Sequence, residues 1–188
     1  LVAVVAAFLY GFDVSPRAEA HLGPNLFLLI LALGLGTGWA WFSGKRVAMT
    51  DMPQMVALYN GMGGGAAAAI AATELLSGNA LAHGVVVTVL AILGGLIGAV
   101  ALSGSLIAWA KLDGRMNKTW RLAKHQYVNA CLLGGALFIG AIISVMAIAG
   151  AADTPVLLIM LFFAVALALG VLLTTPIGGA DMPVVISL

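Results

Sequence analysis

The chain has 188 residues, of which 63% are hydrophobic and 8% charged, with a net charge of +1 at pH 7. This composition lies outside the range of soluble proteins and predicts a membrane protein, and the small net charge argues against a nucleic-acid partner. The single cysteine, Cys131, excludes an internal disulfide and cannot form a metal site by itself.

Taken in chain order, the apolar runs predict an all-α fold, a polytopic transmembrane helix bundle. Five runs are long enough to cross a hydrocarbon layer of about 30 Å as helices. They cover residues 24–42, 53–76, 82–109, 126–150 and 155–175. Partial helices are expected at both ends, over residues 1–12 and from Met182 onward. Both ends therefore look cut, and we expect residues 1–188 to be a single transmembrane domain of a longer protein.

The distribution of cations predicts how this bundle is oriented in the membrane. All lysines and arginines except Arg17 fall in two loops, and two predicted spans separate these loops, so both loops lie on one side. The cations concerned are Lys45, Arg46, Lys111, Arg115, Lys118, Arg121 and Lys124. By the positive-inside rule this side is the cytoplasm, or the matrix in an organelle.

The stretch between Lys45 and Glu74 carries the most informative polar residues. Asp51, followed by Pro53, predicts a helix start at which the carboxylate caps free N–H groups. Asn60 then lies within an apolar span and is followed by a run of glycines. An amide is costly to expose to lipid, whereas glycines allow helices to approach closely, so this span is predicted to pack against another helix.

Small residues also recur at the spacing that favours close helix contacts. Gly34 with Gly38, Gly61 with Gly65, and Gly94 with Gly98 fit the small-xxx-small pattern. With 24 glycines in the chain, the sequence therefore predicts thin, closely packed helices.

A short motif occurs twice. Asp51-Met-Pro recurs at Asp181-Met-Pro, four spans later, so both copies start helices on the cytoplasmic side. One interpretation is a parallel internal repeat. The other is two ordinary helix caps that share three residues by chance.

Three blocks together resemble one known family. Residues 45–58, 103–114 and 178–188 are similar to the membrane part of the β subunit of proton-translocating nicotinamide nucleotide (NAD(P)) transhydrogenase. The resemblance implies a domain that couples proton passage to hydride transfer between NAD(H) and NADP(H). It also implies that this chain binds no cofactor. NAD(H) is bound by a domain of the α subunit, and NADP(H) by a domain that follows residue 188.

The resemblance implies a role for three residues. Asn60 matches a position where members carry His or Asn lining the proton path, and Ser105 matches a serine on a neighbouring helix that faces the same path. Asp181 matches an acidic residue at the cytoplasmic mouth, implicated in coupling to the NADP(H) domain. Because asparagine does not titrate near neutral pH, the titrating histidine is expected on the membrane helices of the α subunit. A bacterial inner membrane and a dimer of the complete enzyme are also implied.

The same residues have simpler interpretations. Asn60 could be only a helix–helix hydrogen-bonding group. Ser103 and Ser105 could bond to carbonyls one turn back in their own helix, and the two aspartates could be only caps. Counting about 1.5 Å per residue, however, Asn60 lies about 10 Å and Ser105 about 9 Å from the cytoplasmic ends of their helices. The two side chains are therefore predicted to share one interhelical space.

Other candidate sites are weaker. His21, His83 and His125 are placed at the membrane surfaces, and their dispersion argues against a metal site. Gly34-Leu-Gly-Thr-Gly38 imitates a dinucleotide-binding loop, but it lies within an apolar span, so no nucleotide is expected there.

Two further function classes stay open at this point. The alternative to a transhydrogenase proton channel is an ion-coupled secondary transporter with a mid-membrane substrate site, which predicts a charged or roomy polar centre. A purely structural membrane scaffold would need no polar seam between Asn60 and Ser105.

Overall fold

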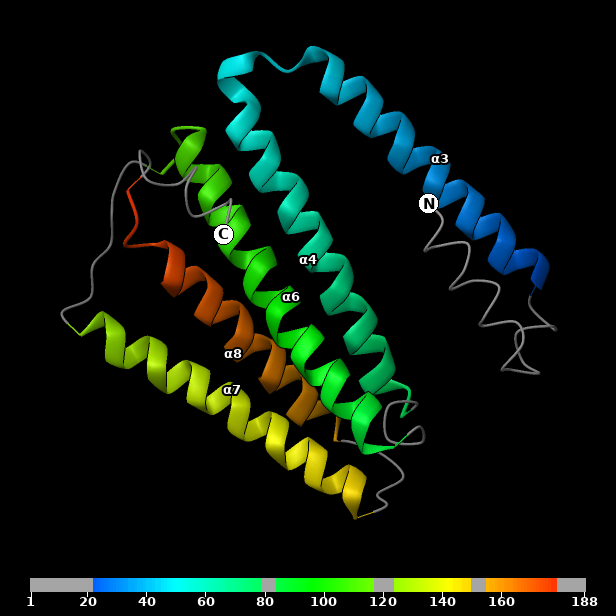
Figure 1. Ribbon diagram of the computed structural model, residues 1–188, viewed down its shortest axis with the longest axis vertical. Coiled ribbons are helices and arrows are strands. Elements are labelled where there is room, and N and C mark those ends of the chain that lie inside the picture. Colours follow the sequence, from blue (N-terminus) through cyan, green and yellow to red (C-terminus); the bar gives the residue numbers. More distant parts are fainter. Residues whose placement is uncertain (1–21, 79–83, 117–123, 150–154, 179–188) are drawn as a thin grey trace. The chain divides into compact units, whose positions relative to one another are not determined.

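The computed structural model describes residues 22–78, 84–116, 124–149 and 155–178. Within these ranges the chain is helical. The elements are α3 (Leu22–Arg46), the 3-10 turn η1 (Met49–Asp51), α4 (Met52–Leu76), α6 (Val85–Leu112), α7 (His125–Ile148) and α8 (Val156–Thr174) (Figure 1). The five α-helices are long and apolar enough to cross a membrane, which confirms the predicted fold class. The partial helices predicted at both ends lie outside the described residues.

The chain divides into two compact units, residues 1–48 and 49–188. In the first unit α3 ends on two cations, Lys45 and Arg46, which complement the negative end of the helix dipole. Lys45 Nζ lies 4.3 Å from the ring centroid of Trp41, and Arg46 Cζ lies 3.9 Å from that of Phe42. Aromatic rings beside cations are typical of a helix end at the membrane surface.

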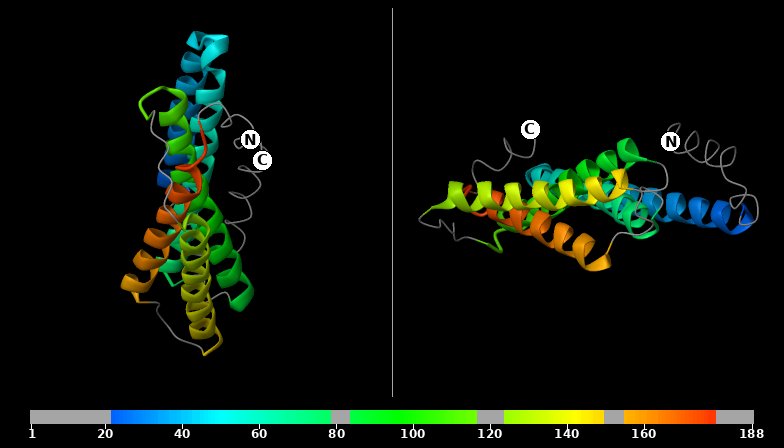
Figure 2. Two further views of the ribbon diagram at one scale, coloured as in Figure 1. Left: turned by 90° about the vertical axis from the view of Figure 1, so that its left-hand side faces the viewer. Right: turned by 90° about the horizontal axis from the view of Figure 1, so that it is seen from below.

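The second unit is organised around α6, which packs against α4, α7 and α8. Figures 1 and 2 show α4 and α7 on opposite sides of the pair formed by α6 and α8. The apolar core between α6, α7 and α8 includes Ile143, Ile159 and Phe162, which are fully buried. Large apolar side chains also cover the outside of the unit, as expected where lipid is the solvent; Leu157, for example, is 79% exposed.

Glycines set the distance between α4 and α6. A Cβ added to Gly98 would lie 2.6 Å from the carbonyl oxygen of Gly64 and 2.7 Å from the nitrogen of Ala68, so the two backbones nearly touch. Gly61 and Gly65 also face α6, as predicted. At Gly94, by contrast, an added Cβ meets no described atom within 4 Å. The next residue, Gly95, faces the neighbouring helices instead: a Cβ there would lie 3.1 Å from that of Ala71 and 3.2 Å from Cζ of Phe163.

The start of α4 differs in detail from the prediction. Pro53 lies in the first turn and Asp51 is the residue before the helix, but the Asp51 carboxylate makes no capping hydrogen bond. Its backbone, at φ −98° and ψ 0°, continues the 3-10 turn instead of adopting the extended conformation typical of a cap. The carboxylate accepts a bond from the Thr50 hydroxyl at 3.3 Å instead.

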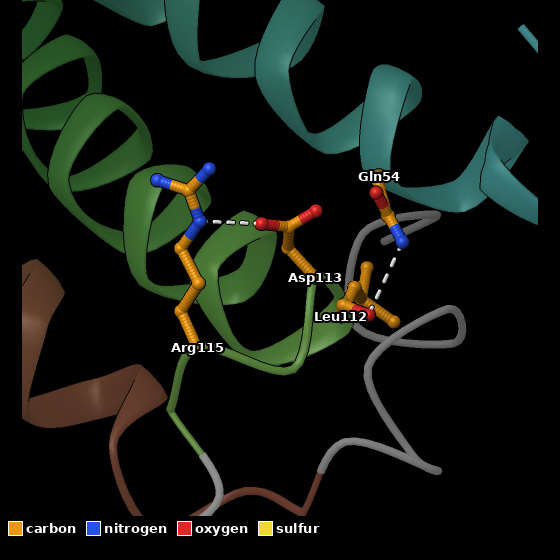
Figure 3. Close-up of polar contacts among 4 residues, drawn as sticks. All are labelled: Gln54, Leu112, Asp113 and Arg115. Atoms are coloured by element: carbon orange, nitrogen blue, oxygen red, sulfur yellow. Dashed lines mark hydrogen bonds and ion pairs between the residues drawn. The ribbon is translucent and has the colours of Figure 1, made fainter.

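The third span is longer than predicted, because α6 continues to Leu112 and includes Lys111, which was assigned to the basic loop. At this end the Gln54 side chain of α4 donates to the carbonyl of Leu112 at 3.2 Å (Figure 3). Arg115 and Asp113 form an ion pair in the turn that follows (Figure 3). The start of α4 and the end of α6 therefore lie together, which fits the prediction that the chain on either side of them emerges on one face of the membrane.

Candidate functional site

A cavity of about 230 Å³ opens between α4, α6 and α8, toward the end of α6 that finishes at Leu112. A water molecule needs only about 10–15 Å³ of such space, so the cavity can hold several. The described lining contains an amide and two hydroxyl groups and no charged side chain. It consists of Asn60, Val100, Ala101, Gly104, Ser105, Ala108, Gly170, Leu173 and Thr174.

Asn60 and Ser105 meet at this cavity. The amide nitrogen of Asn60 donates to the hydroxyl oxygen of Ser105 at 3.4 Å. Gly61 makes the approach possible, since a Cβ added to it would lie 2.9 Å from that of Ser105. The predicted shared space is therefore present. Ser105 is only 7% exposed, whereas Asn60 is exposed on the outside of the unit as well as lining the cavity.

The two serines of α6 make different kinds of hydrogen bond. Ser103 donates to the carbonyl of Ala99 at 3.0 Å, one turn back in its own helix, which is the common arrangement of a serine in a membrane helix. Ser105 instead receives the amide of Asn60 and lines the cavity. Only the second of these two side chains joins one helix to another through a polar contact.

Thr174, at the end of α8, contributes a third polar side chain that the sequence analysis missed. Its hydroxyl donates to the carbonyl of Gly170 at 2.5 Å, and it lies against Gly104, where an added Cβ would come within 3.0 Å of the hydroxyl oxygen. The signal available in the sequence was a pair of threonines closing an otherwise apolar span, ahead of Pro176.

Lys111 is the second missed residue. It is 7% exposed, and its ammonium group donates to three carbonyl oxygens at the end of α8. The distances are 2.8 Å to Thr174, 2.5 Å to Thr175 and 2.8 Å to Ile177. The signal available was the apolar run from Leu106 to Ala110 directly before this lysine, with Leu112 directly after it, which allows the helix to continue through Lys111.

The remaining predicted residues lie apart from the cavity or outside the described ranges. His125 begins α7, where its Nε2 atom lies 3.2 Å from the amide nitrogen of Asn129. Asp181, His21 and His83 lie outside the described residues. Among the residues that the structure describes, no group of three or more His, Cys, Asp or Glu side chains could hold a metal ion.

The sequence pattern of a known family, the NAD(P) transhydrogenase beta subunit, matches residues 1–188. The chain belongs to this family. Two curated relatives, one assigned to Rhodospirillum rubrum and one to a particular strain of that species, are each named NAD(P) transhydrogenase subunit beta. Each is 35% identical over 150 residues, which cover 77% of this chain and 31% of the relative.

Membership of the transhydrogenase beta subunit family confirms the resemblance drawn from the three sequence blocks. The five apolar helices agree with it, since together they make the chain a polytopic membrane protein. The chain spans about a third of the length of the curated relatives it matches. The roles of Asn60, Ser105 and Asp181 therefore stay predictions.

Proposed function

We propose that this chain is part of the proton-translocating membrane domain of an NAD(P) transhydrogenase. In the complete enzyme, proton passage beside α4, α6 and α8 would be coupled to hydride transfer between NAD(H) and NADP(H), which other domains bind. The observation that carries the proposal is the hydrogen bond from Asn60 to Ser105 at the edge of a cavity that can hold several water molecules. The enzyme would lie in a bacterial inner membrane, with the basic loops cytoplasmic.

The cavity suits proton passage better than substrate binding. Its polar groups are an amide and two hydroxyls, which orient water molecules by donating and accepting hydrogen bonds. A secondary transporter for a charged substrate would be expected to place a charge or helix ends at its site, and the described lining offers no charged side chain. Ordered water between Asn60, Ser105 and Thr174 can carry a proton without any of these side chains titrating.

A partner supplies the titrating group in this proposal. Asn60 cannot accept a proton near neutral pH, and its amide is exposed on the outside of the unit, where contact with lipid is costly. A membrane helix of the α subunit packed against this face would cover the amide and could bring a histidine to it. The α subunit would also carry the NAD(H) domain, and two complete enzymes would form the dimer.

Coupling would run through the chain after α8. Alternating access at the cavity would change the contacts of Asp181, at the cytoplasmic surface, with the NADP(H) domain of the same subunit. Such coupling is reciprocal, so NADP(H) binding would shift the proton affinity of the membrane site by the same free energy as protonation shifts NADP(H) affinity.

The test is Asn60→Leu in the complete enzyme. Leucine suits both lipid and helix packing, so folding and nucleotide binding should be largely intact, while proton-coupled transhydrogenation should fall about tenfold. The measurement is proton uptake into vesicles together with the rate of hydride transfer.

Asn129→Leu provides the matched control. It removes the same side chain from α7, where the amide contacts His125 and lines no part of the candidate cavity. Proton transport should be close to normal in this variant. If Asn60→Leu lowers the thermal midpoint but leaves activity and proton transport unchanged, Asn60 is only a helix–helix contact and the proposal is wrong.

A further inference from the structure

Lys111 is a charged residue whose side chain is buried within the second unit. It belongs to the last turn of α6, yet its ammonium group turns inward and reaches three backbone carbonyls at the end of α8, those of Thr174, Thr175 and Ile177. An ammonium has three N–H donors, and each of them is used. Among the described residues its partners are backbone oxygens and not a carboxylate.

The end of α8 compensates the buried charge. The last carbonyls of a helix have no intrahelical partner and carry the negative end of the helix dipole, so a cation is stabilised there. Thr174 is the last residue of α8, and the turn after it supplies the other two acceptors. An unpaired ammonium would be strongly disfavoured in this environment, so Lys111 and the end of α8 hold each other in place.

The same turn lies over the candidate cavity. Thr174 lines the cavity and accepts a bond from Lys111, while Ile177 packs against Ala57 of α4 and Ala108 of α6. One turn before Thr174, an added Cβ at Gly170 would come within 2.5 Å of the carbonyl oxygen of Val100. A shift of the end of α8 relative to α6 would therefore change both the bonds of Lys111 and this side of the cavity.

We propose that Lys111 is a positioning residue that couples the cavity wall on α6 to the chain leaving α8. The inference rests on the proposed function, and it adds a residue to which neither the resemblance nor the family match assigns a role. Through three hydrogen bonds Lys111 fixes the turn at residues 174–177, and the sequence reaches Asp181 four residues later. Movement at the cavity is thus passed to the segment that leads toward the NADP(H) domain.

The test is Lys111→Met in the complete enzyme, with Lys124→Met as the control. Methionine keeps the unbranched side chain without its terminal nitrogen, and so removes the charge and the donors, while Lys124 is an exposed basic residue just before α7. Hydrogen exchange should become faster at the backbone amides of Thr175 and Ile177. These amides donate to the carbonyls of Val171 and Thr174, at the end of α8. The number of protons transported per hydride transferred should fall about fivefold in Lys111→Met and stay normal in Lys124→Met.

The proton-to-hydride ratio separates coupling from simple helix capping. A cap that only stabilises α8 would lower hydride transfer and proton transport together and leave their ratio unchanged, and that result would overturn the proposal. If Lys111→Met does not assemble, Lys111→Gln decides: a polar side chain still fills the site, but the charge and at least one of the three hydrogen bonds are lost, so the ratio should again fall. A normal ratio in Lys111→Gln would equally overturn the proposal.

Asn60→Leu, measured in parallel, distinguishes the two proposals. If Asn60→Leu impairs proton transport while the Lys111 variants keep a normal ratio, the positioning role fails and the proposed function stands. If neither substitution affects proton transport, the proposed function itself fails, and the role of Lys111 fails with it. A lowered ratio in the Lys111 variants, with impaired transport in Asn60→Leu, supports both.

Discussion

The two halves of α6 make opposite kinds of contact within one continuous helix. Up to about Ala99 the buried residues are apolar or glycine apart from Thr88 in the first turn, and Gly98 brings α6 almost onto the backbone of α4. Beyond that point the buried residues include Ser103, Ser105 and Lys111, and a cavity opens between α6 and its neighbours α4 and α8. The close contact in the first half of α6 fixes the position of α4 along the axis of α6. It thereby places Asn60 at the same membrane depth as Ser105, in the second half of α6.

The contrast between the two halves of α6 shows how close packing elsewhere can keep a polar site in place within a membrane helix bundle. Without a hydrophobic driving force between helices, close van der Waals packing provides most of the association, and glycines permit it. A polar seam alone would contribute little, since interhelical hydrogen bonds in membranes average about 0.6 kcal/mol. The close contact at Gly64 and Gly98 is therefore expected to carry the stability, and the pair formed by Asn60 and Ser105 the function.

The largest effect on stability is expected from Gly98→Ala. The added methyl group would meet backbone atoms of Gly64 and Ala68, which cannot move aside as a side chain can, so the helices must separate. Overpacking of this kind costs about 1–3 kcal/mol of unfolding free energy. The thermal midpoint of the purified protein in detergent measures it.

Gly94→Ala is the matched control, one turn earlier on the same helix. A Cβ there meets no described atom within 4 Å, and alanine favours a helix over glycine by up to about 1 kcal/mol. This variant should be neutral or slightly more stable. Equal losses of stability in the two variants would show that the close backbone contact between α4 and α6 is not at Gly98.

An intermediate effect, on function and not on folding, is expected from Ser105→Ala. The substitution removes the hydroxyl that accepts the Asn60 amide and one polar group of the cavity, so proton-coupled turnover should fall about fivefold. Ser103→Ala removes only a bond to the carbonyl of Ala99 within the same helix and should leave turnover near normal. Steady-state transhydrogenation with simultaneous proton recording compares the two, and a larger loss in Ser103→Ala would contradict the division between the serines.

These contrasts show what the sequence could and could not predict. The spans follow from hydropathy alone, because a backbone in lipid must satisfy its own hydrogen bonds and so becomes helical. The common level of Asn60 and Ser105 follows from counting residues along two antiparallel helices. Both predictions use information local to a helix.

The missed features depend on partners that local patterns do not show. Lys111 is buried because the end of α8, 63 residues later in the chain, lies beside it. Gly95 replaces Gly94 because the contacting face of α6 is rotated by one residue, which a spacing pattern does not determine. Asp51 makes no capping bond because a 3-10 turn precedes the helix and sets its backbone angles.

The smallest effects are expected at the two Asp-Met-Pro motifs, where the comparison is between two aspartates instead of two halves of a helix. Asp51 is exposed and its carboxylate caps no N–H group, so Asp51→Asn should change the free energy of unfolding by less than about 0.5 kcal/mol. Proton-linked turnover should also be normal. Thermal unfolding and turnover of the complete enzyme check both statements.

Asp181→Asn tests whether the second motif does more than start a helix. Asparagine caps about as well as aspartate, so a capping role predicts a harmless substitution at either motif. If the charge of Asp181 couples the membrane part to the NADP(H) domain, Asp181→Asn should shift the Kd for NADP(H) about threefold to fivefold and slow proton-linked turnover, while the helix survives. Equal, small effects in Asp51→Asn and Asp181→Asn would reduce the repeat to two helix starts and remove Asp181 from the mechanism, and the polar half of α6 would then need another route to the nucleotide.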